Sequence, residues 1–201
     1  MRLGLLADIH EEVDLLKRAI EALQSAGVQQ FVVLGDIFET GRAIDATVNA
    51  LAELNSDGVW GNHDFGLCRD VGEATRKRYS QSVLNYFGSL HPWIELHACR
   101  FQHIEPFLDS ENLEDLWAYG GDGHPDAARS FDACSSRRIF MGHIHRWELI
   151  APTGTVTWTG QEPVHLKPES RYLVVVNAVQ QGWCAWYDTE EDLLCPLQVN
   201  A

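Results

Sequence analysis

Residues 2–10 read RLGLLADIH, and the same plan, an apolar run closed by polar residues, returns in FVVLGD at 31–36 and in GVWGNHD at 58–64. Apolar runs of this length are typical of buried strands. Residues 12–26, between the first two runs, carry apolar side chains at helical spacing, and a second helix is expected at 43–54. Strand and helix therefore alternate through the first third of the chain, and this order favours a parallel sheet.

The polar residues that close these runs are predicted to lie together. The carboxyl ends of parallel strands meet at one edge of a sheet, where α/β folds bind their ligands. The residues concerned are Asp8, His10, Asp36, Asn62, His63 and Asp64. Carboxylate, imidazole and amide groups that are far apart in the sequence would thus be gathered at one edge.

The remainder of the chain is predicted to add further helices and a second sheet. Helices are expected at 65–86, 111–117 and 125–134. Strands are expected at 94–96, 99–101, 138–141, 147–151, 154–160, 171–177 and 182–187. The first two strands can form a hairpin that ends near His103, and the last four favour a largely antiparallel second sheet. The chain shows no internal repeat, low-complexity tract or linker, so a single domain over 1–201 is expected.

Composition narrows the class of protein. The 201 residues are 45% hydrophobic and 22% charged, as in an ordinary globular chain, and the formal net charge is −14. Negative charge of this size repels nucleic-acid backbones and anionic membranes, so we expect neither duplex nucleic acid nor a membrane as a partner. The five cysteines are scattered and form no CxxC pair, and no signal peptide or apolar span is recognisable. A cytoplasmic location with reduced thiols is expected.

Five polar clusters have the composition of a metal site. They are Asp8-x-His10, Gly35-Asp36-x-x-Glu39, Gly61-Asn62-His63-Asp64, His103 and Gly142-His143-x-His145. Carboxylates, imidazoles and an amide suit divalent metals such as Mn, Fe or Zn, and residues two apart on an extended chain point to the same side. Taken singly, each cluster has an ordinary interpretation: 61–64 can be a turn, and Asp36 can cap a helix. These interpretations leave the order and placement of all five clusters unexplained.

The ordered clusters resemble those of the calcineurin-like metallophosphoesterases, and they look most like the small single-domain bacterial and archaeal phosphodiesterases of that superfamily. The resemblance runs over nearly the whole chain and is strongest at 3–64 and 138–145. It implies an α/β fold, a four-layer α/β/β/α sandwich of two mixed β-sheets flanked by helices (the metallo-dependent phosphatase fold), with the active site at the sheet edge. It also implies a cofactor of two divalent metal ions, Mn first, with Fe, Zn, Ni or Co as alternatives.

The resemblance further implies which residues bind the two metals. The seven implied ligands are Asp8, His10 and His145 on the first metal, Asn62, His103 and His143 on the second, and Asp36 as the bridge. His103 is preferred to His97 because it ends an apolar strand and precedes a turn that contains proline.

A reaction is implied as well. A hydroxide between the two metals would attack phosphorus, and His63 would protonate the leaving group as a general acid. Glu39 stands where the family has an acid that holds this histidine, and Asp64 is a weaker candidate for the same role. Glu39 also has a plainer interpretation, as an acidic residue near a helix start. The expected partner is a small phosphorylated substrate or a phosphate anion.

The sequence departs from the family pattern at two places that bear on the substrate. Ser/Thr protein phosphatases of the superfamily have an arginine directly after the acid at the Glu39 position, and this chain has Thr40 there. Many small phosphodiesterases carry an Asn-Pro-Gly-Ser-like loop after the last histidine pair, whereas residues 157–165 read TWTGQEPVH. A small phosphodiester or a nucleotide is therefore favoured over a phosphoprotein, and no narrower preference is transferred.

Residues 65–92 lie between the third and fourth clusters and can form a small cap insertion. The basic residues of this segment would then meet an anionic substrate, or they form a solvated helix face: Arg69, Arg76, Lys77 and Arg78. Three other functions stay open: a non-catalytic metal-binding scaffold of the same fold, a phosphomonoesterase of the Ser/Thr protein phosphatase type, and a nucleic-acid nuclease, which the net charge of −14 disfavours. The chain keeps all seven ligand positions and His63, which favours the enzyme. A homo-oligomer is also compatible with the sequence.

Overall fold

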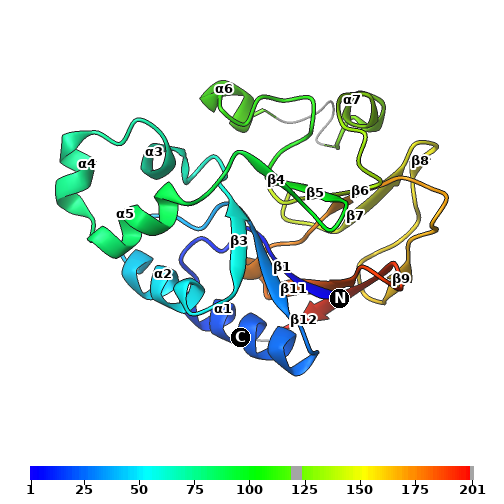
Figure 1. Ribbon diagram of the computed structural model, residues 1–201, viewed down its shortest axis with the longest axis horizontal. Coiled ribbons are helices and arrows are strands. Elements are labelled where there is room, and N and C mark those ends of the chain that lie inside the picture. Colours follow the sequence, from blue (N-terminus) through cyan, green and yellow to red (C-terminus); the bar gives the residue numbers. More distant parts are fainter. Residues whose placement is uncertain (119–123, 200–201) are drawn as a thin grey trace.

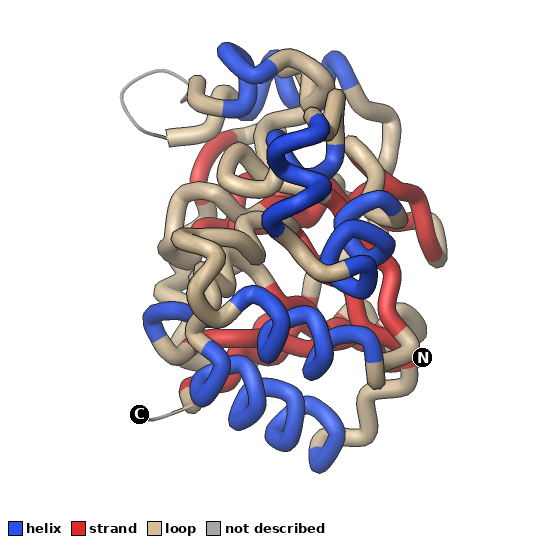
Figure 2. The backbone as a smooth tube through the Cα atoms, turned by 90° about the vertical axis from the view of Figure 1, so that its left-hand side faces the viewer, coloured by secondary structure: helices blue, strands red, loops and turns tan. Residues whose placement is uncertain are grey.

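The computed structural model describes residues 1–118 and 124–199 of the chain. Two six-stranded mixed sheets lie face to face, with strand orders β3-β2-β1-β11-β12-β9 and β4-β5-β6-β10-β7-β8 (Figure 1). Figure 2 shows helices outside both layers of strands. The α/β sandwich of two mixed sheets expected from the sequence is confirmed.

The first half of the first sheet follows the predicted order. Strands β1 (Arg2–Leu6), β2 (Gln30–Leu34) and β3 (Ser56–Val59) are parallel, and the helices between them are α1 (Val13–Ser25) and α2 (Ile44–Ala52). Successive strand residues point to opposite faces. This alternation sends side chains from both faces of the sheet into apolar cores.

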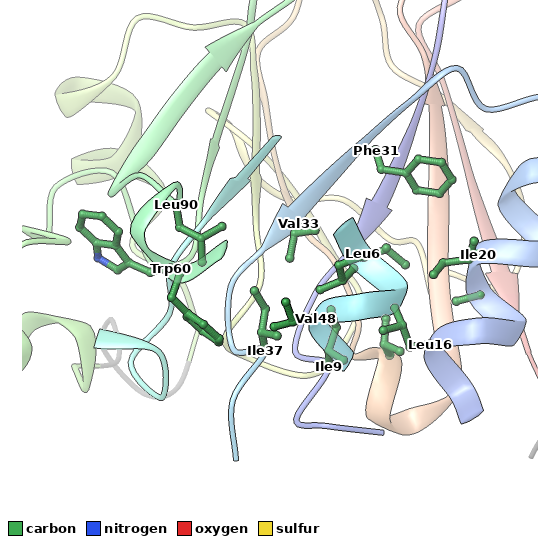
Figure 3. Packing of buried hydrophobic residues seen from close by; sticks show 14 of the residues in the cluster. Leu6, Ile9, Leu16, Ile20, Phe31, Val33, Ile37, Val48, Trp60 and Leu90 are labelled. Atoms are coloured by element: carbon green, nitrogen blue, oxygen red, sulfur yellow. The ribbon is translucent and has the colours of Figure 1, made fainter. Parts of the chain in front are cut away.

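Two cores result from this alternation. On the outer face, Leu6 and Val33 pack with Leu16 and Ile20 of α1, as Figure 3 shows. On the inner face, Leu5 of β1 belongs to the core between the two sheets. The sheet is therefore fixed from both sides, and the strand ends that carry the polar residues are rigidly placed.

The other half of the first sheet corrects the sequence analysis. Strands β11 (Trp183–Asp188), β12 (Leu193–Gln198) and β9 (Val164–His165) complete it, and β11 pairs antiparallel with β1. The prediction that 182–187 joins the second sheet was wrong, and β12 was not anticipated. An apolar pattern indicates that a strand is buried, but it does not indicate which neighbouring strand pairs with its backbone N–H and C=O groups.

The second sheet contains the remaining strands. They are β4 (Trp93–Leu96), β5 (Cys99–Gln102), β6 (Arg138–Met141), β7 (Glu148–Ala151), β8 (Gly154–Thr155) and β10 (Tyr172–Val175). The hairpin of β4 and β5 is confirmed, while β5, β6 and β10 run parallel to one another, so this sheet is mixed rather than largely antiparallel. The parallel strands point the ends of β5 and β6 in one direction.

Three short helices replace the long helix expected at 65–86. They are α3 (Phe65–Cys68), α4 (Glu73–Arg78) and α5 (Gln81–Gly88). The Ser80 hydroxyl accepts a hydrogen bond from the backbone N–H of Val83 and so caps α5. The function of this segment as a cap stays a prediction.

The remaining helical elements are α6 (Leu113–Leu116), α7 (Ala127–Ala133) and the 3₁₀ turn η1 (Val179–Gln181). Helix α7 packs Phe131 against Ile139 and Leu173 on the outer face of the second sheet. Within the described ranges, no helix combines the length and the apolar character needed to cross a membrane.

Candidate metal centre

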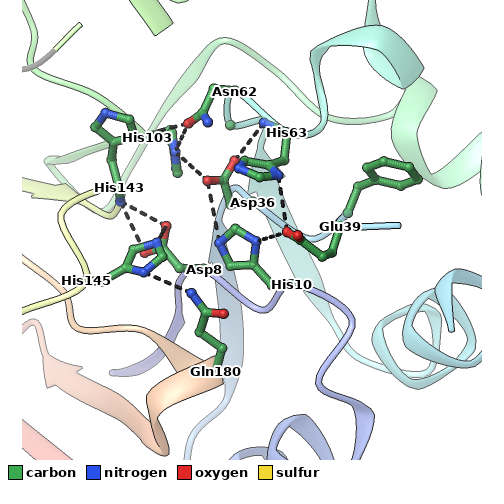
Figure 4. Close-up of polar contacts among 12 residues, drawn as sticks. Asp8, His10, Asp36, Glu39, Asn62, His63, His103, His143, His145 and Gln180 are labelled. Carbon is green, nitrogen blue, oxygen red and sulfur yellow. Dashed lines mark hydrogen bonds and ion pairs between the residues drawn. The ribbon is translucent and has the colours of Figure 1, made fainter. Parts of the chain in front are cut away.

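The structure brings all seven predicted ligand residues into one cluster, which Figure 4 shows. Asp8 and His10 follow β1, Asp36 follows β2, Asn62 follows β3, His103 follows β5, and His143 and His145 follow β6. Strand ends from both sheets therefore supply the cluster.

The backbone is strained where these residues lie. Positive φ angles occur at Asp8 (51°), His10 (46°), Asp36 (52°), His143 (72°) and His145 (53°). Such a conformation costs a non-glycine residue on the order of 1–3 kcal/mol and persists only where the surrounding structure enforces it. Five such residues in one cluster are typical of a functional site.

Glycine is required where these loops approach one another. A Cβ atom at Gly61 would lie 2.2 Å from Oδ1 of Asp36, and one at Gly142 would lie 2.8 Å from Oδ2 of Asp8. Any side chain at these two positions would push the carboxylates out of place. The glycines in the sequence clusters thus permit the close packing of the candidate ligands.

The first group of ligand atoms contains Asp8, His10, Asp36 and His145, whose atoms all lie within 4.8 Å of one another. Nε2 of His145 lies 3.2 Å from Oδ1 of Asp8. Nε2 of His10 lies 3.7 Å from Oδ2 of Asp36. This group contains the three residues predicted for the first metal, together with the predicted bridge.

The second group contains Asp36, His103 and His143. Nε2 of His103 lies 3.3 Å from Oδ2 of Asp36. The side-chain oxygen of Asn62 lies 3.0 Å from Nε2 of His103 and 3.0 Å from Nδ1 of His143. Asp36 is common to both groups, which is the place predicted for the bridging carboxylate.

His97, the alternative to His103, lies elsewhere. Its Nε2 is 3.0 Å from the side-chain oxygen of Gln30 on the exposed surface. His103 is fully buried in the cluster. The geometry thus favours the histidine that ends the apolar strand.

The histidine tautomers fit a metal. Nδ1 of His103 lies 2.7 Å from the carbonyl oxygen of Leu34, and Nδ1 of His10 lies 2.8 Å from Oε2 of Glu39. If each Nδ1–H donates to these acceptors, Nε2 of the neutral ring is left with a lone pair that faces Asp36. Nε2 of His10 is buried and has no hydrogen-bond partner among the described residues. A cation between these atoms would satisfy a polar atom that is otherwise costly to bury.

The electrostatics point the same way. Burial alone would raise the pKa of Asp36, but the adjacent His103 and His63 together outweigh burial and hold this pKa below its ordinary value. Burial lowers the pKa of His103, but the charge and hydrogen bond of Asp36, the charge of Asp8 and the carbonyl group of Leu34 together outweigh burial and raise this pKa to about 9. Burial and the charge of His103 lower the pKa of His143 to about 3. A proton on His103 balances Asp36 here, and a metal ion would take over that task and release the proton.

Glu39 joins the cluster to His63. Its Oε2 lies 3.3 Å from Nδ1 of His63 and 2.8 Å from Nδ1 of His10. These three residues also have the spacing of a metal-binding group. The ring of His63 is half-buried, and its centroid lies 4.7 Å from that of His10 and 5.3 Å from that of Trp117.

Asp64, the weaker candidate for holding His63, makes different contacts. Its carboxylate accepts hydrogen bonds of 2.9 Å from the backbone N–H groups of Ile37, Phe38 and Gly61. Burial and the nearby charge of Asp36 raise the pKa of Asp64 to about 7. These contacts tie the loop after β2 to the loop after β3, and the contact to His63 is made by Glu39.

Comparison with known proteins identifies the family. The model of the calcineurin-like phosphoesterase superfamily domain matches residues 1–168, a range that includes every residue of the cluster. The chain belongs to this superfamily. This phosphoesterase is 20% identical over 193 residues to an uncharacterized protein of Methanocaldococcus jannaschii, with 89% of this chain and 76% of that protein covered.

Solved structures share the fold of this calcineurin-like phosphoesterase. A metallophosphoesterase from Sphaerobacter thermophilus superposes with a TM-score of 0.77 at 21% identity, covering 100% of this chain and 88% of that chain. A novel archaeal phosphodiesterase superposes with a TM-score of 0.56 at 14% identity, covering 99% of this chain and 100% of that chain. At these identities the likeness establishes the fold.

Two residues that the sequence analysis missed support the cluster of candidate metal ligands. The amide of Gln180 lies 2.9 Å from Nδ1 of His145. The carboxylate of Glu11 accepts hydrogen bonds from the backbone N–H groups of Glu39 (3.0 Å), Gly41 (2.5 Å) and Ala43 (2.7 Å). The sequence analysis singled out neither Gln180 nor Glu11. Glu11 thus holds the loop that carries Glu39.

Glu11→Gln is expected to lower the free energy of unfolding by about 1–3 kcal/mol at pH 7, because an amide NH₂ would face a backbone donor. Burial raises the pKa of Glu11, but the backbone N–H groups of 39–43 outweigh it and lower this pKa. The stabilisation is therefore complete above the unfolded-state pKa of about 4.3 and is lost as the pH falls through the folded-state value. Urea denaturation of the natural chain and of Glu11→Gln at pH 7 and pH 3 measures this stabilisation.

The exposed neighbour Glu12 provides the control, since Glu12→Gln should change stability little at either pH. A loss in Glu11→Gln that is equally large at both pH values would contradict the role of the Glu11 charge.

A cavity of about 340 Å³ opens over the cluster of candidate metal ligands. Its walls include His10, Asp36, Asn62, His63 and His143, and Trp117 and Arg146 lie at its sides. Nε of Arg146 lies 2.5 Å from Oε1 of Glu148. The cavity gives a small molecule direct access to both groups of candidate ligands, and we call it the metal cleft.

Proposed function

We propose that this protein hydrolyses a small phosphodiester with the help of two divalent metal ions held in the metal cleft. The observation that carries the proposal is the position of Asp36, which belongs to two groups of ligand atoms at once and lies beside His63. Metal ions bound there would supply positive charge to the phosphoryl oxygens and lower the pKa of a water molecule. The first metal would be held by Asp8, His10 and His145, and the second by Asn62, His103 and His143, with Asp36 shared.

His63 has the task of moving a proton in this proposal. Its Nδ1 faces the carboxylate of Glu39 at 3.3 Å, and this contact orients the ring. The ring lines the metal cleft, so its other nitrogen can serve the oxygen of a departing alcohol. Glu11 supports this arrangement, because it fixes the backbone N–H of Glu39.

A diester is favoured over a phosphoprotein for two reasons. Thr40 occupies the place of the arginine that the protein phosphatases use. In addition, a solved structure with the same fold is that of an archaeal phosphodiesterase. Manganese is the first metal to test, since a mixed set of carboxylates, imidazoles and an amide suits it.

The test is hydrolysis of bis-p-nitrophenyl phosphate by chelator-stripped protein as Mn²⁺ is added back, with p-nitrophenyl phosphate assayed in parallel. We expect no turnover without metal and turnover of the diester that saturates with added Mn²⁺. Turnover of the monoester alone would indicate a phosphomonoesterase. Absence of turnover of both compounds with two metals bound per chain would overturn the proposal in favour of the scaffold.

A further inference from the structure

A second cavity adjoins the metal cleft at His63. It has a volume of about 300 Å³ and lies between the loop after β2 and helices α3 and α4. Its walls include Phe38, His63, Leu67, Thr75 and Tyr79. His63 lines both cavities, whereas none of the seven candidate ligands lines this one. We call it the side pocket.

The walls of the side pocket are mainly apolar and aromatic. The rings of Phe38 and Tyr79 meet edge to face, with centroids 6.0 Å apart and an interplanar angle of 84°. Small-molecule sites are typically cavities of this size, with apolar and aromatic walls and few polar groups. Such walls suit a flat aromatic ring better than a sugar or a peptide.

One basic residue of the 65–92 segment faces the side pocket. Arg69 pairs with Glu111, Lys77 pairs with Glu73 at 2.6 Å, and Nε of Arg76 donates to the carbonyl oxygen of Val71 at 3.0 Å. Arg78 lines the pocket, and its Nη2 donates to the carbonyl oxygen of Thr40 at 3.5 Å.

The guanidinium carbon of Arg78 lies 5.2 Å from the centroid of the Tyr79 ring. Among the described residues that line the pocket, this arginine is accompanied by no carboxylate, although the whole chain has a net charge of −14. A guanidinium at an aromatic wall stacks on planar rings and attracts an anion. The pocket thus matches an aromatic group attached to a phosphate.

We infer that the side pocket binds the leaving group of the substrate and that this group is aromatic, as in a nucleoside or an aryl alcohol. The inference rests on the proposed function for the reaction itself. Water supplies an oxygen atom to phosphorus, the bond from phosphorus to the alcohol oxygen breaks, and that oxygen receives a proton from His63. The products are a phosphomonoester and the free alcohol; one proton of the water stays on the oxygen that the phosphomonoester gains, and the other restores His63.

Binding is tested with adenosine and chelator-stripped protein by saturation-transfer NMR, which needs no turnover. Ala74 is exposed on α4 and lines the pocket, so Ala74→Trp fills the pocket without disturbing a core. We expect adenosine to bind to the natural chain about tenfold or more tightly than to Ala74→Trp, the scale of one lost base–aromatic stack. Lys77→Trp, on the same helix but outside the pocket, is the matched control and should bind adenosine normally.

Two further measurements separate the pocket from the metal cleft. Line broadening of the ³¹P signal of inorganic phosphate by the Mn²⁺-loaded protein should be the same in the natural chain and in Ala74→Trp. Arg78→Ala should raise KM for bis-p-nitrophenyl phosphate several-fold, whereas Arg76→Ala should leave it unchanged.

Two results would contradict the inference that the side pocket binds an aromatic leaving group. One is equal binding of adenosine to the natural chain, Ala74→Trp and Lys77→Trp, and the other is no binding to any of them. If adenosine binds as expected but no diester is hydrolysed, the proposed function is wrong, and the side pocket is still a binding site for an aromatic group. If the diester is hydrolysed equally well by Ala74→Trp, the pocket fails and the proposed function stands.

Discussion

Asp36→Asn is expected to lower kcat/KM for bis-p-nitrophenyl phosphate by about a thousandfold or more and to leave fewer than two metal ions per chain. Asp36 is shared by both groups of ligand atoms, so the loss of its charge weakens both metal positions. Asparagine has nearly the same shape, and its backbone can keep the hydrogen bonds of this loop. The deficit should therefore appear in metal content rather than in the fold.

Atomic absorption after gel filtration measures the metals, and the Mn²⁺ add-back assay measures turnover. Asp14→Asn, an exposed acid in the first turn of α1, removes the same charge far from the cluster and should change neither quantity. An Asp36→Asn protein that retains two tightly bound metals would show that another residue forms the bridge.

His63→Ala should slow a diester with a poor leaving group far more than one with a good leaving group. A general acid contributes about 10²–10⁴ in rate when the departing oxygen needs a proton. A nucleoside alkoxide needs one, whereas p-nitrophenolate is stable without it. We therefore expect a large fall in kcat for thymidylyl-thymidine and a fall of less than about tenfold for bis-p-nitrophenyl phosphate.

The metal content of His63→Ala distinguishes a role of His63 as a general acid from a role as a metal ligand. His63 lies within metal-binding distance of His10 and Glu39, so a third metal position is the competing interpretation. His63→Ala should retain two metals per chain, as should His91→Ala, which changes an exposed histidine elsewhere. An equal loss of rate on both diesters would exclude the general acid.

Much of the candidate site could be predicted because it lies at strand ends. The apolar runs at 2–7 and 31–34 determine where β1 and β2 stop, and the residues directly after a parallel strand lie at the binding edge of the sheet. Asp8 and Asp36 could therefore be placed near each other from the sequence alone. Gly61 could also be noted in the sequence. The reason why glycine is needed there, that a Cβ atom would lie 2.2 Å from Asp36, could be found only in the structure.

The residues that hold the ligands in place could not be predicted in this way. Glu11 contacts a loop some 30 residues further along the chain, and Gln180 contacts a histidine 35 residues before it. Such pairs depend on how the loops fold over one another, and neither a periodic pattern nor a propensity records that.

The sequence by itself determined the family, the order of the first three strands and the set of candidate ligands, because each of these is a local property repeated at strand ends. Only the tertiary structure decided that β11 pairs with β1, that Glu39 rather than Asp64 contacts His63, and that Arg78 alone among the four basic residues of 65–92 lines a cavity beside His63. The physical reason is the same in each case. A side chain or strand edge is satisfied by whichever partner the packing of distant elements brings within hydrogen-bonding or van der Waals distance.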